Sequence, residues 1–230
     1  MKGRFPTLLG CLLVLFAELG AQAKPAPEAA AGDWDFRFTV LKYKGGGDWY
    51  EGKVGVPNLM EFLRTNTRLR PQPTPDVIEA DDAALLRCRF LLVKGHGEIR
   101  FTESEVRYLR EWLLAGGFLY ADDDYGMDVA FRREIKRVFP EKELAPLPSN
   151  HPLYRQYFEF PQGTPKIHEH DGGPPRTLGI WNGDRLMVLY TVNTDIGDGW
   201  APWQVHKDPE AVRLLALQFG VNVILYSMTR

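Results

Sequence analysis

Residues 90–121, FLLVKGHGEIRFTESEVRYLREWLLAGGFLYA, decide the fold of this chain. The segment opens with the apolar run Phe90–Val93 and closes with a second apolar run, Phe118–Ala121. Four consecutive apolar residues are typical of a strand that is buried on both faces, as in a parallel sheet covered by helices. We therefore expect two buried strands here.

The residues between these two runs predict a helix. Thr102 and Glu105 have the spacing of a capping box, in which each side chain binds the backbone N–H of the other residue. An apolar stripe at helical spacing follows, formed by Val106, Leu109, Trp112 and Leu113. Gly116 and Gly117 are suited to end such a helix. Strand, helix and strand then follow one another directly.

The same alternation extends to both sides of this segment. Upstream, apolar and polar residues alternate over 34–40, which predicts a first strand. A helix is expected from Pro57 and a short second strand at Val77–Ile78. Downstream, apolar residues over 131–139 predict a helix that ends at Pro140. Alternating strands and helices predict a mostly parallel sheet with helices on both faces.

The second half of the chain is less regular. Residues 151–175 are rich in Pro, Gly and His, and we expect a long structured loop. Residues 178–192 predict a β-hairpin around an Asn182-Gly183 turn. A last helix is expected after Asp208, with Asp208 as its cap. We therefore predict a flavodoxin-like α/β sandwich with a late β-hairpin.

The N-terminus predicts export. Lys2 and Arg4 precede an apolar run over 8–17, and Ala21-Gln22-Ala23 has the pattern of a cleavage site. We expect a signal peptide over 1–23, a flexible leader over 24–32 and a single α/β domain over 33–230. Lipidation at Cys11 is the alternative, but most of the apolar run would then lie on the wrong side of the cut. The mature chain is expected in the periplasm or cell envelope, without a membrane span.

Composition excludes some classes of partner and chemistry. The 230 residues carry a net charge of −2, and no basic run predicts a nucleic-acid partner. The only cysteines are Cys11 and Cys88, so the mature chain cannot form an internal disulfide. The absence of a G-x-S-x-G sequence removes a serine-hydrolase elbow.

Three polar loops follow predicted strands, and the carboxyl ends of parallel strands meet at one edge of a sheet. The loops are 45–50 (GGGDWY), 95–97 (GHG) and 122–125 (DDDY). Glycine and aspartate also favour ordinary turns, which is the alternative interpretation. As ligand-binding candidates we take Gly46, Gly47, Asp48, Trp49, Tyr125 and, from a further loop over 195–200, Trp200. That further loop is otherwise interpreted as a turn.

A second group of residues predicts a divalent metal ion. On an extended segment His168 and His170 point the same way, and two imidazoles can converge on one ion. Asp122 and Asp123 are the carboxylate candidates, and further ligands could come from His96, His151 or His206. The alternative is a polar loop whose histidines are solvated.

Residues 89–121 resemble a segment of the class I glutamine-amidotransferase-like superfamily. In that superfamily a catalytic cysteine follows the second of these strands, where this chain has Asp122 and Asp123. Almost the whole mature chain resembles the bacterial family called domain of unknown function 4159, on the segments 45–50, 95–97, 117–124, 166–170 and 197–200. The resemblance implies the amidotransferase-like fold and no established activity.

Two hypotheses of function follow. The first is a metal-assisted hydrolase of a small polar or carbohydrate-like substrate, in which Asp122, Asp123, His168 and His170 hold the ion and His96 or Glu169 is the general base. The second is a non-catalytic module of the cell envelope that binds a small polar ligand or an envelope component. In this second case aromatic residues would line the pocket. A scaffold in which the loops only stabilise the fold is a third possibility.

Overall fold

A computed structural model describes residues 34–168 and 172–229. The expectations for the signal peptide and the leader, and for Glu169 and His170, fall outside these residues.

Strands and helices alternate through the first half of the described chain. The strands are β1 (Thr39–Leu41), β2 (Asp76–Ile78), β3 (Phe90–Gly95), β4 (Phe118–Asp123), β5 (Ala145–Pro146), β6 (Arg176–Asn182) and β7 (Arg185–Val192). The α-helices are α1 (Val56–Asn66), α2 (Glu103–Leu114), α3 (Asp128–Val138), α4 (Trp203–His206) and α5 (Glu210–Met228). Most helices and strands therefore occur where the apolar patterns predict them, with β5 and α4 as additions.

The strands form one seven-stranded sheet in the order β2-β1-β3-β4-β7-β6-β5. Strands β2, β1, β3, β4 and β7 are parallel, whereas β6 and β5 run antiparallel to their neighbours. The prediction of a mostly parallel sheet with a late β6–β7 hairpin is confirmed. Gly183 occupies the left-handed region (φ 58°) that the hairpin turn requires.

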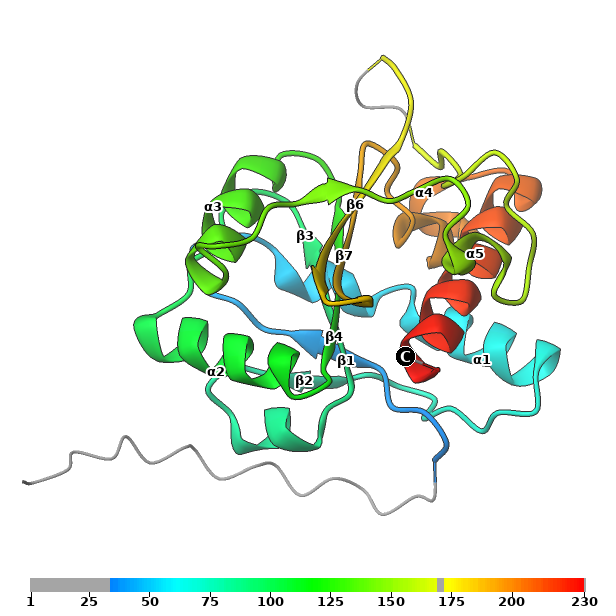
Figure 1. Cartoon of the computed structure of the whole chain (residues 1–230). Coiled ribbons are helices and arrows are strands. Elements are labelled where there is room, and N and C mark those ends of the chain that lie inside the picture. The colour runs from blue at the N-terminus through cyan, green and yellow to red at the C-terminus, as the bar shows by residue number, and fades with distance from the viewer. Residues whose placement is uncertain (1–33, 169–171, 230) are drawn as a thin grey trace, which may run out of the picture.

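Alternating residues of the central strands face opposite layers of helices. Phe90 and Leu92 pack in the core under α1 and α5, whereas Leu91 and Val93 pack in the core under α2 and α3. Figure 1 shows the two pairs of helices on opposite sides of the sheet. The continuous apolar run of β3 therefore reflects a strand with both faces buried.

Local signals in the sequence explain the start of α2. The Thr102 side chain accepts a hydrogen bond from the Glu105 N–H (3.2 Å), and Glu105 accepts one from the Thr102 N–H (2.7 Å). The predicted capping box is thus present. The same reasoning fails at α5, because its first residue is Glu210 and no side chain caps it. Asp208 instead contacts His168.

Helix α5 is long and apolar enough to cross a membrane, by length and composition alone. Its buried residues, among them Phe219 and Val223, share a core with α1 and the sheet. Leu214 and Leu215, near its start, are partly exposed. Packing in this core accounts for the buried apolar residues between Ala216 and Tyr226.

Candidate functional site

The site is built on a buried lysine at the carboxyl end of β3. Lys94 pairs in register with Asp122 of β4, so the two side chains leave the sheet on the same face. Its ammonium group contacts the carboxylate of Asp124 and lies 2.7 Å from Oδ1 of Asp198. Only 3% of the Lys94 side chain is exposed. Two strands and a distant loop therefore meet at one buried charge.

The loop after β7 brings Asp198 to this point. The N–H of Gly197 donates a hydrogen bond to Asp122 Oδ2 (2.7 Å). A Cβ at Gly197 would lie 2.2 Å from Cε of Lys94, so only glycine fits without a shift. Behind the loop the Trp200 indole is buried, and its Nε1–H donates to the carbonyl oxygen of Ala216 (2.9 Å). Packing on both sides thus fixes the position of Asp198.

His168 approaches Asp198 from the segment before β6. Its backbone N–H donates to the carbonyl oxygen of Thr194 (3.1 Å), which ties this segment to the loop after β7. The ring nitrogen Nδ1 lies 3.3 Å from Asp198 Oδ2 and 3.5 Å from Asp195 Oδ2. The other nitrogen, Nε2, lies 2.7 Å from Asp208 Oδ1. Both nitrogens of the His168 ring therefore face carboxylates.

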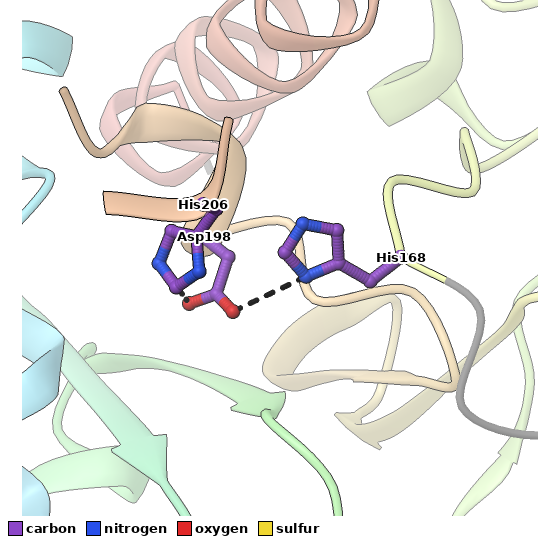
Figure 2. A group of neighbouring side chains, drawn as sticks. All are labelled: His168, Asp198 and His206. Carbon is purple, nitrogen blue, oxygen red and sulfur yellow. Dashed lines mark ion pairs between the residues drawn. The ribbon is translucent and has the colours of Figure 1, made fainter. Parts of the chain in front are cut away.

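His206, at the end of α4, completes the group. Its Nε2 lies 3.6 Å from Asp198 Oδ1, and its ring centre is 5.3 Å from that of His168. Figure 2 shows the Asp198 carboxylate with one oxygen directed at each imidazole. Ligand atoms of His168, Asp198 and His206 all lie within 4.8 Å of one another. This spacing allows all three to bind one metal ion.

The surrounding charges shift the pKa values of this group. Asp195, Asp198 and Asp208 raise the pKa of His168 to about 11, although burial acts in the opposite direction. Burial favours a higher pKa for Asp198, but His168 and Lys94 outweigh it and hold this pKa below the ordinary value. Without a metal ion, His168 therefore carries a proton at neutral pH.

The buried strand-end groups are shifted as well. Burial opposes the charge of Lys94, yet Asp124 and Asp198 raise its pKa above the ordinary value of 10.5. Burial raises the pKa of Asp122 to about 6 in spite of Lys94. It also raises the pKa of Asp124 well above the ordinary value. The field at this edge of the sheet is dominated by acidic groups in low dielectric.

The glycine-rich loops form a second polar feature at the end of β3. Asp48 accepts hydrogen bonds from the backbone N–H of His96 and, at 2.9 Å, lies against Nδ1 of its ring. Gly47 donates its N–H to the carbonyl oxygen of Glu98 (3.0 Å). The loops at 45–50 and 95–97 are thus in direct contact, as their place after parallel strands predicts.

Comparison with known protein families identifies the family of this chain. A family model for a domain of unknown function (DUF4159) matches residues 37–228. The chain belongs to this family. No curated protein matches it.

The predicted metal ligands of this DUF4159 domain have different positions. His168 and Asp122 belong to the group around Lys94. Asp123 alternates to the other face of β4, where its Oδ1 accepts hydrogen bonds from the N–H groups of Tyr125 and Met127 at the start of α3. The structure therefore places Asp122 near the group formed by His168, Asp198 and His206, which we call the histidine group. Asp123 instead binds backbone N–H groups at the start of a helix.

The predicted ligand-binding residues of the DUF4159 domain are also divided. Trp200 is 1% exposed and packs edge-on against Phe38, so its ring is not available to a ligand. Tyr125 is half-exposed, with φ 94°. Trp49 is partly buried and lies under the ammonium group of Lys53. Space is open around Gly46.

Sequence reasoning missed two members of the group. Asp198 lies in the loop that we otherwise interpreted as a turn, and Lys94 was not among the candidate site residues. His206 was one of several candidates for a further ligand. The signal that could have found Asp198 is the pair Asp195 and Asp198 in a glycine-containing loop, close in sequence to His206.

A second acidic group lies elsewhere and already has a cation. Ligand atoms of Glu79, Asp81 and Glu105 are also close together. However, the ammonium group of Lys44 lies 2.7 Å from Glu105 and 3.7 Å from Glu79. We therefore assign the candidate metal centre to the histidine group.

The structure also has two hollows of about 830 and 440 Å³. Both are lined by residues 87–89 and by Gly116, which precede β3 and β4. They therefore lie at the amino ends of the strands, away from the histidine group. Ligands of open α/β sheets bind beyond the carboxyl ends, so we place the functional site there.

Proposed function

We propose that this domain is a metal-assisted hydrolase of a small polar or carbohydrate-like substrate. The observation that carries the proposal is the convergence of His168, Asp198 and His206 at the carboxyl edge of the sheet. Two imidazoles and a carboxylate suit a zinc-like transition metal ion better than Mg²⁺ or Ca²⁺.

The spacing of the group fits a metal ion better than hydrogen bonds. Nitrogen and oxygen ligands about 2.0–2.1 Å from a tetrahedral ion lie roughly 3.3 Å from each other. The separations of 3.3 Å (His168 Nδ1 to Asp198 Oδ2) and 3.6 Å (His206 Nε2 to Asp198 Oδ1) are near this value, each to a different oxygen of the carboxylate. Both exceed the ordinary N–H···O range of about 2.7–3.2 Å.

The contacts around the group also favour a bound cation. The 2.7 Å contact between His168 Nε2 and Asp208 matches the carboxylate that commonly orients a metal-binding imidazole. Among the described residues, the carboxyl groups around Lys94 and His168 outnumber these two cations. The carboxyl groups are those of Asp122, Asp124, Asp195, Asp198 and Asp208. A divalent ion would stabilise the ionised form of these buried carboxyl groups.

A metal ion at this place would polarise a substrate carbonyl or acidify a water molecule at neutral pH. Asp198 and the two histidines would hold it. Lys94 and Asp208 would fix the orientation of these ligands. His96 or Glu169 would accept the proton of the attacking water, as the sequence suggests.

Metal content tests the proposal. The mature protein is loaded with Zn²⁺ or Mn²⁺, dialysed and analysed by mass spectrometry, beside a His168→Ala/His206→Ala double variant. We expect near-stoichiometric metal in the parent and loss in the variant, while His96→Ala retains the ion. A His168→Ala/His170→Ala variant shows whether His170 contributes. Equal metal content in the parent and the double variant would reject the site.

A non-catalytic binding module of the cell envelope is the second candidate. It is favoured by Tyr50, Tyr125 and Trp203, whose side chains are each more than half exposed in segments that follow β1, β4 and β7. Under this proposal a small polar ligand or envelope component binds without turnover. Hydrolysis of any ester, amide or glycoside in a substrate panel, lost in the His168→Ala/His206→Ala variant, would exclude it.

We also propose the flavodoxin-like, amidotransferase-like class for the fold. The parallel strands follow the order β2-β1-β3-β4-β7, which corresponds to the flavodoxin-like order 2-1-3-4-5. With Asp122 and Asp123 at the place of the superfamily's cysteine, thiol chemistry is not carried over.

Export to the periplasm or cell envelope is proposed from the first 23 residues. If it is correct, full-length protein expressed in a bacterium is recovered from the periplasm with Lys24 as its first residue. N-terminal sequencing of that fraction checks this. Recovery of unprocessed chain in the cytoplasm would oppose the proposal.

A further inference from the structure

The contact between Asp48 and His96 determines which nitrogen of the His96 ring carries the hydrogen, as well as where the loop lies. One oxygen of the Asp48 carboxylate accepts the backbone N–H of His96, and the other lies 2.9 Å from Nδ1 of the same residue. A carboxylate can only accept hydrogen bonds, so Nδ1 of His96 must carry the hydrogen. In the neutral ring, Nε2 then bears the lone pair.

The free nitrogen of His96 is accessible. Half of the His96 side chain is exposed, against 27% of the Asp48 side chain. Within residues 34–168 and 172–229, Nε2 of His96 has no hydrogen-bond partner, whereas Nδ1 has Asp48. An imidazole held at Nδ1 by a carboxylate, with Nε2 accessible from solvent, is the arrangement of an oriented general base.

Glycines on both loops allow this contact. A Cβ at Gly95 would lie 2.8 Å from Oδ1 of Asp48 and 2.5 Å from the Tyr43 hydroxyl. A Cβ at Gly47 would lie 2.6 Å from the carbonyl oxygen of His96. Gly95 also has φ 139°, a conformation that residues with a side chain rarely adopt. The two loops can therefore approach closely enough to pair Asp48 with His96 only because glycine stands at these positions.

We infer that Asp48 is a positioning residue that holds His96 in the Nδ1–H tautomer, and that His96 Nε2 is the general base of the site. Nε2 accepts one proton from a water molecule as the water oxygen bonds to the substrate, and the resulting imidazolium gives that proton to the leaving group as the bond between the leaving group and the substrate breaks. The catalytic role rests on the proposed hydrolase function. The tautomer does not, because it follows from the Asp48 contact alone.

His151 provides an internal control, because the hydrogen of its neutral ring is expected on the other nitrogen. Its Nδ1 accepts a hydrogen bond from the N–H of Leu153 (3.3 Å), so its hydrogen lies on Nε2, near the Tyr226 hydroxyl. The same protein should thus contain one histidine of each neutral tautomer. A method that distinguishes the two nitrogens can compare them in a single sample.

The test is a two-bond ¹H–¹⁵N correlation spectrum of the His96 and His151 imidazoles in the EDTA-treated mature protein, at mildly alkaline pH. His96→Gln and His151→Gln variants assign the signals. We expect a protonated Nδ1 and an unprotonated Nε2 for His96, and the reverse for His151. An Nε2–H tautomer or an averaged signal for His96 in the parent protein would overturn the inference.

The reactivity of Nε2 tests the positioning role. Diethyl pyrocarbonate acylates accessible imidazole nitrogens, and peptide mass spectrometry follows each histidine. We expect rapid modification of His96 Nε2 in the parent and slower modification in Asp48→Ala, with unchanged metal content. An unchanged rate of His96 modification in Asp48→Ala would show that Asp48 only holds the loop in place. If the His168→Ala/His206→Ala variant retains its metal ion, the proposed metal site is wrong. The role of Asp48 in positioning His96 does not depend on that outcome.

Discussion

Lys94 Nζ lies 2.7 Å from Oδ1 of Asp198, and this ion pair joins the end of a central strand to the loop after β7. The opposite oxygen of Asp198 faces His168 at 3.3 Å. Lys94 comes from the sheet, whereas Asp198 comes from a loop more than a hundred residues later. The sheet therefore determines where the carboxylate of the candidate metal centre can lie.

Replacement of Lys94 by methionine should destabilise the protein strongly. The change keeps most of the side-chain volume but leaves Asp124 buried without its cation and removes one of the cations beside Asp198. Breaking a buried ion pair costs about 3–5 kcal/mol of unfolding free energy, which urea denaturation measures. Lys53→Met is the control, since Lys53 lies over the Trp49 ring and its loss should cost about 1 kcal/mol or less. Equal effects of the two changes would contradict this account.

Replacement of Asp208 by alanine should weaken metal binding and leave the fold intact. Asp208 accepts the Nε2–H of His168 and so directs Nδ1 towards Asp198. Loss of such a contact typically lowers metal affinity about 10–100-fold. Zn²⁺ titration calorimetry checks this, with the exposed hairpin residue Asp184→Ala as the control. Matching affinities in both variants would mean that Asp208 does not orient His168.

Most of the fold could be predicted because its signals are local. Continuous apolar runs and a capping box identify β3, α2 and β4. The first strand was predicted over 34–40, yet β1 covers Thr39–Leu41. Phe36 pairs with Pro71, whereas Thr39 pairs with Asp76, so the register of the two segments shifts between these positions and the ladder is interrupted. Strand β5 has only two residues, too few for an alternating pattern.

The site was predicted less well because it joins segments that are distant in sequence. His168 and Asp198 meet only after the hairpin has formed, and no local period relates them. In contrast, the separation of Asp122 from Asp123 follows from strand alternation, which was not applied to this pair. Trp200 was assigned to a pocket because its loop is polar, although large aromatic residues also anchor such loops in the core.

Replacement of Gly197 by alanine should disturb the site through packing alone. The backbone of Gly197 has φ −65°, which alanine tolerates, but its Cβ would lie 2.2 Å from Cε of Lys94. Because ion pairs hold that lysine, the overpacking should cost about 1–3 kcal/mol in urea denaturation and reduce Zn²⁺ binding. Gly172→Ala is the matched control, since no atom lies within 4 Å of its added Cβ. A Gly197→Ala variant as stable as this control would show that Lys94 can move.

Replacement of Asp122 by asparagine should change how stability depends on pH. Burial raises the pKa of Asp122 from 3.8 to about 6, so folding favours the protonated form. The contribution of this group to stability is therefore fully present below pH 3.8 and is lost as the pH rises through about 6. Asparagine does not titrate and escapes this loss.

Urea denaturation of the EDTA-treated parent and Asp122→Asn, at several pH values between 4 and 7, checks this expectation. A shift of about two pKa units corresponds to roughly 3 kcal/mol. The stability of Asp122→Asn relative to the parent should therefore increase by up to this amount from pH 4 to pH 7. Titration of Asp124 affects both proteins and largely cancels in the comparison. A difference that stays constant over this range would mean that Lys94, Thr191 and Gly197 keep Asp122 ionised throughout.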